Sequence, residues 1–276
     1  VFEHRNYFAV LGVLLAGTDL VLRMPVSEIP RIRQFTIGVL IVGALALTLI
    51  RSAGWGNPLQ LAMELVAKNP TSPRASTDLG EQFMIRAGND PTSRFYAMAE
   101  REFERGSRVP NASPMPEQGL IVLAAGAGKP ANPEWWDRII HKLQTRAIGP
   151  QELSMVTGLL QMRQEGLELD DARFADAYLV LVNRMQMPPT QYYAFGEHAL
   201  VYLNDEVLAE SLFKRAVERS GEHPEFIAAM VDALLKQGRV TQAKAVADHA
   251  RTLGFANVEL PDVASPEPAE TRERGN

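Results

Sequence analysis

The chain of 276 residues has no cysteine and no excess of basic residues. Without cysteine it can form neither a disulfide bond nor a cysteine-based metal site. Its formal net charge of −5 argues against nucleic-acid binding, which needs a basic stripe to displace counterions from phosphates. The histidines show no metal-ligand spacing; they are His4, His141, His198, His223 and His249. We therefore expect no metal and no other cofactor.

Long apolar runs are confined to the first 50 residues, in the segments 7–24 and 35–50. Each is near the lower end of the ~17–25 residues that cross ~30 Å of hydrocarbon. Both have apolar residues on every face, which favours a transmembrane hairpin over 1–54, with a buried soluble helix as the alternative. Arg23, Arg31 and Arg33 lie in the short connection, so the positive-inside rule puts that connection in the cytoplasm.

After residue 55 the sequence is patterned as successive helices, and near its end it shows an internal repeat. Three small or aromatic positions recur after 34 residues: Ala209, Phe213 and Ala216, then Ala243, Ala247 and Ala250. This period, with small residues where two helices touch, is typical of tetratricopeptide repeats. The first-helix position usually held by Gly or Ala aligns with Glu197 and Val231, so we expect the repeats to be degenerate.

Fainter helix pairs precede this repeat. Helices are expected around 116–127 and 133–147, and around 151–165 and 171–184, the last opened by Asp170. The predicted fold is all-α: a two-helix transmembrane hairpin followed, over 55–257, by a degenerate tetratricopeptide-like α-solenoid of about five helix pairs. The segment 258–276, rich in Pro, Glu and Arg, is expected to be a disordered tail.

The residues before the first apolar segment form a polar motif, Glu3-His4-Arg5-Asn6-Tyr7. An arginine can hold phosphate oxygens with two hydrogen bonds, and His or Glu can assist proton transfer. The alternative is an ordinary polar cap at a membrane interface.

This motif, followed by two apolar segments and then by tetratricopeptide repeats, resembles the C-terminal end of the bacterial transmembrane-and-tetratricopeptide protein O-mannosyltransferases. These are polytopic glycosyltransferases of the GT-C type. The family often continues with Leu-Pro-Ser after the tyrosine, where this chain has Phe8-Ala9-Val10. The resemblance implies sugar transfer from a polyprenyl-phosphate donor to a protein acceptor. It also implies that Glu3, His4 and Arg5 form the rim of the lipid-phosphate donor site.

The same resemblance implies that the catalytic acidic residues precede Val1, so this chain alone is expected to be inactive and to contribute no catalytic residue. Because the chain begins with Val rather than Met, we expect it to continue a longer polypeptide. The implied location is the bacterial inner membrane, in contact with lipid, with the repeat domain in the periplasm.

The first helices of a helical solenoid commonly line a groove that binds an extended peptide. Tyr193, Glu197 and Asp232 are the residues predicted to line such a groove for the acceptor protein. The alternative function is a non-enzymatic, membrane-anchored tetratricopeptide scaffold that assembles envelope proteins.

Overall fold

The computed structural model describes residues 12, 15–17, 19, 30–221 and 223–255, and every regular element among them is a helix. The all-α prediction is confirmed for this part of the chain. The helices are α2 (Pro30–Trp55), α3 (Pro58–Lys68), α4 (Pro73–Ala87), α5 (Arg94–Ser107), α6 (Met115–Gly126), α7 (Pro133–Thr145), α8 (Pro150–Gln164), α9 (Asp171–Arg184), α10 (Pro189–Val201), α11 (Glu206–Ser220), α12 (Pro224–Lys236) and α13 (Val240–Thr252). They belong to two compact units, Val1–Leu61 and Ala62–Asn276, which we describe separately.

Proline and capping residues set where these helices begin. Proline is the first residue of α2, α3, α4, α7, α8, α10 and α12. Proline suits this position because its ring fixes a helical φ and the backbone N–H that it lacks would have no partner there. Side-chain oxygens of Ser72, Asn132, Asp170 and Asp205 accept a hydrogen bond from the first turn of α4, α7, α9 and α11. The helix starts are therefore encoded locally.

The first unit contains α2, whose apolar side chains are exposed to solvent over much of its length. Phe35, Leu47 and Ile50 have 74%, 70% and 71% of their surface accessible. No helix in the described part of the chain is both long enough and apolar enough to cross a membrane. The residues 34–50 of α2, between two arginines, are 17 in number. At ~1.5 Å per residue such a stretch covers about 25 Å, which is at the lower limit for crossing ~30 Å of hydrocarbon.

This finding contradicts two of the predictions made from the sequence. One is the transmembrane hairpin over 1–54, and the other is the inner-membrane location with a periplasmic repeat domain. Both rested on the apolar composition of the segments 7–24 and 35–50, and the uncharged part of α2 is only at the lower limit of the length that a membrane helix needs. Most of the first apolar segment, 7–24, lies outside the described residues, as does the predicted disordered tail over 258–276.

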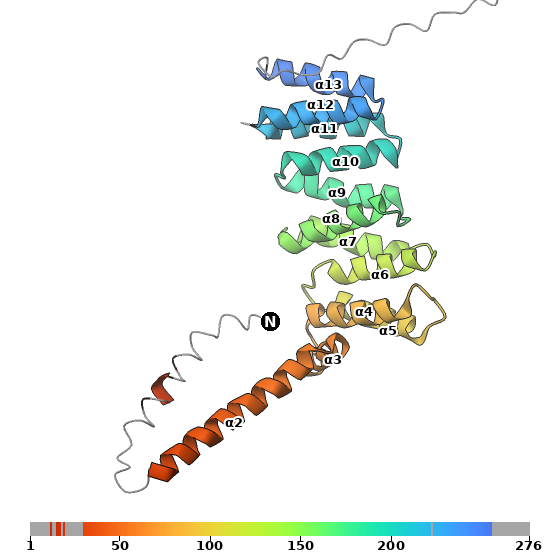
Figure 1. Cartoon of the computed structure of the whole chain (residues 1–276). Coiled ribbons are helices and arrows are strands. Elements are labelled where there is room, and N and C mark those ends of the chain that lie inside the picture. The colour runs from red at the N-terminus through yellow and green to blue at the C-terminus, as the bar shows by residue number, and fades with distance from the viewer. Residues whose placement is uncertain (1–11, 13–14, 18, 20–29, 222, 256–276) are drawn as a thin grey trace, which may run out of the picture. The chain divides into compact units, whose positions relative to one another are not determined.

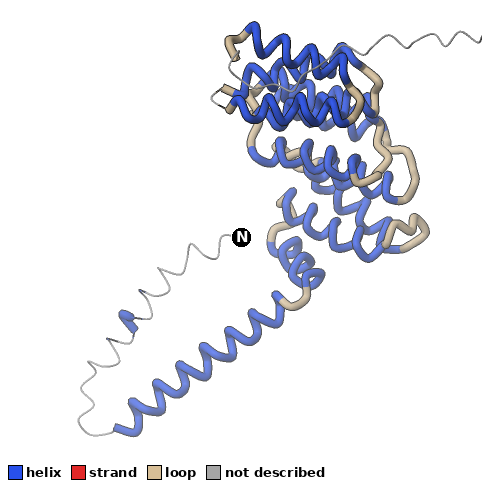
Figure 2. The backbone as a smooth tube through the Cα atoms, turned by 45° about the horizontal axis from the view of Figure 1, so that its top comes forward, coloured by secondary structure: helices blue, strands red, loops and turns tan. Residues whose placement is uncertain are grey.

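The second unit is a stack of helical hairpins (Figure 1). Consecutive helices pair as α4/α5, α6/α7, α8/α9, α10/α11 and α12/α13. Several neighbouring hairpins meet through like helices, since α4 contacts α6, α6 contacts α8, α7 contacts α9 and α11 contacts α13, whereas α5 also contacts α6 and α9 contacts α10. Figure 2 shows that the connections between these helices are loops. The core is a line of fully buried side chains that runs through the stack, including Phe103, Leu120, Ile139, Leu159, Phe174, Phe195, Phe213 and Val231.

Two phenylalanines pack where a neighbouring helix has glycine instead of a side chain. Phe103 of α5 lies against Gly80 of α4 and Gly119 of α6, so that a Cβ at either glycine would come within 2.6 Å or 2.4 Å of its ring. A Cβ at Gly196 of α10 would lie 2.5 Å from the ring of Phe213 in α11. Real Cβ atoms do not approach this closely, so glycine is required at these three positions.

Gly196, which contacts Phe213, is one residue away from the position that the repeat alignment predicted for a small residue. The period of 34 placed the small first-helix residue at Glu197, but Gly196 faces Phe213. Adjacent residues on a helix point about 100° apart, so only one of the two can face α11. The side chain of Glu197 instead bonds to Gln237, which follows α12.

We predict that Gly196→Ala destabilises the chain because the new methyl group meets the buried ring of Phe213. Overpacking costs about 1–3 kcal/mol, whereas replacing a helical glycine by alanine gains only about 1 kcal/mol. In a Phe213→Leu background the ring is gone, so the same substitution should become neutral or stabilising. Thermal unfolding of the four proteins gives the comparison, with Val207→Ala, at a side chain 82% exposed, as the control. An equal effect of Gly196→Ala in both backgrounds would show that the contact does not limit stability.

Candidate functional site

Basic side chains recur at the junctions between successive elements of the stack, where they donate hydrogen bonds to carbonyl groups at the end of an earlier helix or in the connection that follows it. The bonds run from Arg105 to Pro70, from Lys142 to Ser107 and Ser113, from Arg146 to Ala112, from Arg184 to Leu143 and Arg146, and from Arg215 to Val182. The last carbonyls of a helix have no partner within it and carry partial negative charge. A basic side chain from a later helix gives such a carbonyl a hydrogen-bond donor and also balances its partial negative charge.

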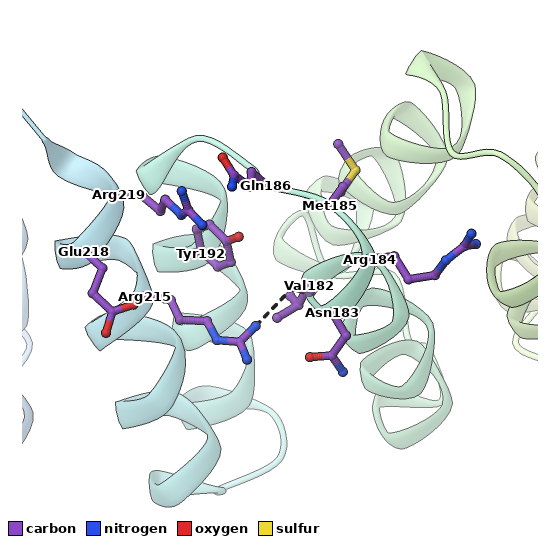
Figure 3. Close-up of a pocket in the computed structure, with 9 residues that line it drawn as sticks. All are labelled: Val182, Asn183, Arg184, Met185, Gln186, Tyr192, Arg215, Glu218 and Arg219. Atoms are coloured by element: carbon purple, nitrogen blue, oxygen red, sulfur yellow. Dashed lines mark hydrogen bonds between the residues drawn. The ribbon is translucent and has the colours of Figure 1, made fainter.

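At one junction the helices leave a pocket of about 300 Å³. It lies between the last turn of α9, the connection into α10 and the second half of α11 (Figure 3). Its lining residues are Val182, Asn183, Arg184, Met185, Gln186, Tyr192, Arg215, Glu218 and Arg219. Several of them are exposed, namely Asn183, Arg184, Gln186, Glu218 and Arg219, so the pocket is open to solvent.

The arginines of this pocket differ in what they bind. Arg215 is half-buried and donates from Nη1 to the carbonyl of Val182 at 3.1 Å, across the pocket from α11 to α9. Arg184 donates to Arg146 O at 2.8 Å, and Figure 3 shows its side chain directed away from α11. Arg219 is exposed and makes no hydrogen bond or ion pair with any residue that the structure describes. Its guanidinium is therefore available to a ligand.

The remaining lining groups add hydrogen-bond donors. The hydroxyl of buried Tyr192 accepts a bond from the backbone N–H of Met187 at 3.4 Å, so its own proton can be donated elsewhere. Asn183 and Gln186 bring side-chain amides. Glu218 is the one acidic lining residue, and its Oε1 lies 3.3 Å from Nε2 of His249 in α13. The pocket is therefore rich in donors and positively charged.

The predicted acceptor groove is only partly assembled. Tyr193 donates its hydroxyl proton to Glu197 at 2.8 Å, and Gln237 donates to the same carboxylate oxygen at 2.9 Å. Burial, together with the bond to Glu197, raises the pKa of Tyr193. Asp232 instead pairs with Lys236 on its own helix at 2.6 Å. The first two residues thus join α10 to the end of α12, and their polar groups are already used within the fold.

The predicted donor-site rim, Glu3, His4 and Arg5, lies outside the described residues. Sequence reasoning also missed Arg215 and Arg219, which the structure places in the pocket. The two arginines are four residues apart in the sequence, and this spacing predicts that both lie on one face of a helix. No pattern in the sequence showed that the end of α9 would lie opposite that face.

A buried ion pair joins α6 to α7. Lys142 Nζ donates to Glu117 Oε1 at 2.6 Å, with 6% and 0% of the two side chains exposed. Burial lowers the pKa of Lys142, against the opposing effect of Glu117. Glu117 Oε2 is buried and accepts no hydrogen bond from a described residue. Because both side chains are buried, the pair is closed to a substrate and joins the two helices.

Next to this pair, Glu104 links α5 to α7. It accepts hydrogen bonds from Trp135 Nε1 at 2.8 Å and from Arg138 Nη2 at 2.9 Å. Burial by itself would raise the pKa of Glu104, but the bonds from Arg138 and Trp135 outweigh it and lower the pKa. Arg138 also approaches Glu117, at 3.8 Å, and so connects the two carboxylates.

A histidine lies in the core between α9 and α10. His198 Nε2 is 3.1 Å from Asp171 Oδ1, and Asp171 also accepts two hydrogen bonds from Arg163 at 2.8 and 2.9 Å. The imidazole packs edge-on against the rings of Phe174 and Tyr178. Burial lowers the pKa of His198, although its contact with Asp171 acts in the opposite direction. With 1% of its surface exposed, His198 is closed to any substrate.

Within the described part of the chain, no group of three or more His, Asp or Glu side chains is placed to hold a metal ion. Comparison with known proteins finds no matching family model, no matching curated protein and no matching solved structure. The open pocket between α9 and α11 is therefore the candidate functional site, on its geometry and charge.

We predict that Lys142→Met costs about 3–5 kcal/mol of unfolding free energy, because it leaves the buried Glu117 carboxylate with only the longer contact to Arg138, at 3.8 Å. The double variant Glu117→Leu, Lys142→Met should recover most of this loss, since no buried charge remains. The unfolding free energies of both variants and of Glu117→Leu, measured by urea unfolding, complete a double-mutant cycle. Lys236→Met, which breaks an exposed pair with Asp232, should cost less than about 1 kcal/mol. Additive losses from the two core substitutions would contradict the pairing.

We predict that the chain loses stability as the pH falls through 6.5, the usual pKa of histidine, towards the lower pKa of His198 in the fold. In this window the unfolded chain binds a proton that the folded chain does not, so protonation favours unfolding. His198→Gln keeps a hydrogen-bonding side chain but does not titrate. It should make the unfolding free energy depend less on pH in the range just below 6.5. The same substitution at exposed His141 is the control. Equal flattening in both variants would refute the assignment to His198.

Proposed function

We propose that the hairpin stack of the second unit is a degenerate tetratricopeptide-like scaffold that binds a segment of a partner protein. Two features support the repeat assignment. The positions of Ala209, Phe213 and Ala216 correspond, 34 residues later, to Ala243, Ala247 and Ala250, and like helices of several neighbouring hairpins contact one another. The contact between Gly196 and Phe213 fits a repeat in which the second helix packs on a small residue of the first.

The observation that carries the binding role is the open pocket between α9 and α11. It lies between successive hairpins, where a solenoid offers its neighbour-to-neighbour grooves to ligands. Its donors exceed its acceptors, and Arg219 has no partner among the described residues. An open volume of about 300 Å³ beside this guanidinium offers a ligand both space and hydrogen-bond donors.

The glycosyltransferase hypothesis stays a prediction that rests on the sequence resemblance. Its donor-site residues, Glu3, His4 and Arg5, lie outside the described part of the chain, and so does its link to a polyprenyl-phosphate sugar. Under that hypothesis the scaffold would present the acceptor protein, so a binding role for the hairpin stack is common to both functions. We therefore propose the scaffold and make no proposal for the transfer reaction.

The proposed function predicts that the purified chain selects linear peptides from a random display library. Selected peptides should compete with one another, and a bound peptide should slow amide hydrogen exchange in α9, α10 and α11. An unrelated protein immobilised in the same way gives the background. If the chain enriches no peptide above that background, or if protection falls only on helices remote from the pocket, the scaffold function is wrong.

A further inference from the structure

We propose that the pocket between α9 and α11 binds carboxylate side chains of an acidic peptide segment, with Arg219 as the main contact and Arg215 beside it. This inference rests on the proposed scaffold function and specifies the ligand of the same site. It follows from three features of the pocket: its charge, the hydrogen-bond donors that the fold leaves unused, and the apolar groups next to them.

The charge of the pocket is opposite to that of the chain. The whole sequence has a formal net charge of −5, whereas the lining includes three arginines and one glutamate. Glu218, the one acidic lining residue, lies 3.3 Å from His249 of α13, which is outside the lining. The local excess of cations therefore faces an acidic ligand, and it would repel a basic one.

The unused donors match a carboxylate. A guanidinium has five N–H donors in a planar fork that fits the two oxygens of a carboxylate. Arg215 uses one of its nitrogens to bond Val182 O at 3.1 Å, which fixes that side chain across the pocket. Arg219 follows one helical turn later and bonds to no described residue, so its fork remains available. One arginine is thus positioned by the fold, and the other is left for the ligand.

The rest of the lining indicates a peptide rather than a small anion. The pocket volume of about 300 Å³ is several times what one carboxylate fills, and exposed residues keep it open on its outer side. Val182, Met185 and the ring of Tyr192 provide apolar surface beside the arginines. A chain that alternates acidic and apolar side chains can place the former on Arg219 and the latter on this surface. Asn183 and Gln186 can bond to its backbone.

Fluorescence anisotropy with two labelled peptides tests the proposal on the full chain. One peptide alternates Glu and Val, the other alternates Gln and Val, and both have blocked ends. We expect the chain to bind the Glu peptide, and to bind the Gln peptide about tenfold or more weakly, because each charged hydrogen bond is replaced by a neutral one. Arg219→Ala should weaken binding of the Glu peptide about tenfold or more while leaving the unfolding temperature unchanged.

Two further variants separate binding from folding. Arg101→Ala removes the same charge from an exposed position of α5, and should leave both affinity and stability as they are. Arg215→Ala should weaken the Glu peptide and also lower the unfolding temperature, because the bond to Val182 O is lost. A loss of affinity equal in Arg101→Ala and Arg219→Ala would overturn the proposal, because it would show only a general effect of charge.

Binding of the Glu peptide that is unaffected by Arg219→Ala would also overturn the assignment to this pocket. If the display library yields peptides without acidic residues and the Glu peptide does not bind, the acidic-ligand proposal is wrong but the scaffold function stands. If the library yields no peptide at all, the scaffold function itself fails. The two failures are therefore distinguishable.

Discussion

The stack depends on the close approach of helices at glycine, where a phenylalanine ring fills the space that a side chain would take. Phe103 lies between two such glycines, Gly80 of α4 and Gly119 of α6, and is fully buried. Because the ring touches both helices, one side chain of α5 sets the distance between three helices. Gly196 and Phe213 repeat half of this arrangement three hairpins further along. At Phe103 this contact places α6 of the second hairpin beside α4 of the first.

A second interaction joins one hairpin to the next. Apolar packing is non-directional, whereas the bonds from basic side chains to the carbonyls that end an earlier helix have direction and fix how the hairpins align. Within one hairpin, the buried pair of Glu117 and Lys142 joins α6 to α7. A buried pair gives little net stability, since desolvation offsets much of the attraction. Its contribution is better understood as fixing one packing of the two helices.

Local features of the sequence predicted the helices well, because the signals that begin a helix are local. Asp170 was expected to open a helix over 171–184, and it caps α9 over that range. Features that depend on contacts between distant parts of the chain were harder to predict from the sequence. The repeat alignment selected Glu197 instead of Gly196, because a period cannot show which of two adjacent residues faces Phe213. The membrane prediction came from apolar composition and from segment lengths near the lower limit for a span, and no helix of the described residues is long and apolar enough to support it.

The candidate site was the least accessible to prediction, because its two sides come from different hairpins. Val182 lies in the last turn of α9, in one hairpin, and Arg215 lies 33 residues later in α11, the second helix of the next hairpin. In the stack α7 packs closely on α9, and α11 on α13, whereas α9 and α11 approach each other less closely. At that wider junction Arg215 reaches across to α9, and the pocket forms around its side chain. The same kind of bond, from a basic side chain to a carbonyl at the end of an earlier helix, therefore also shapes the pocket. Arg219, one helical turn beyond Arg215, makes no such bond to a described residue.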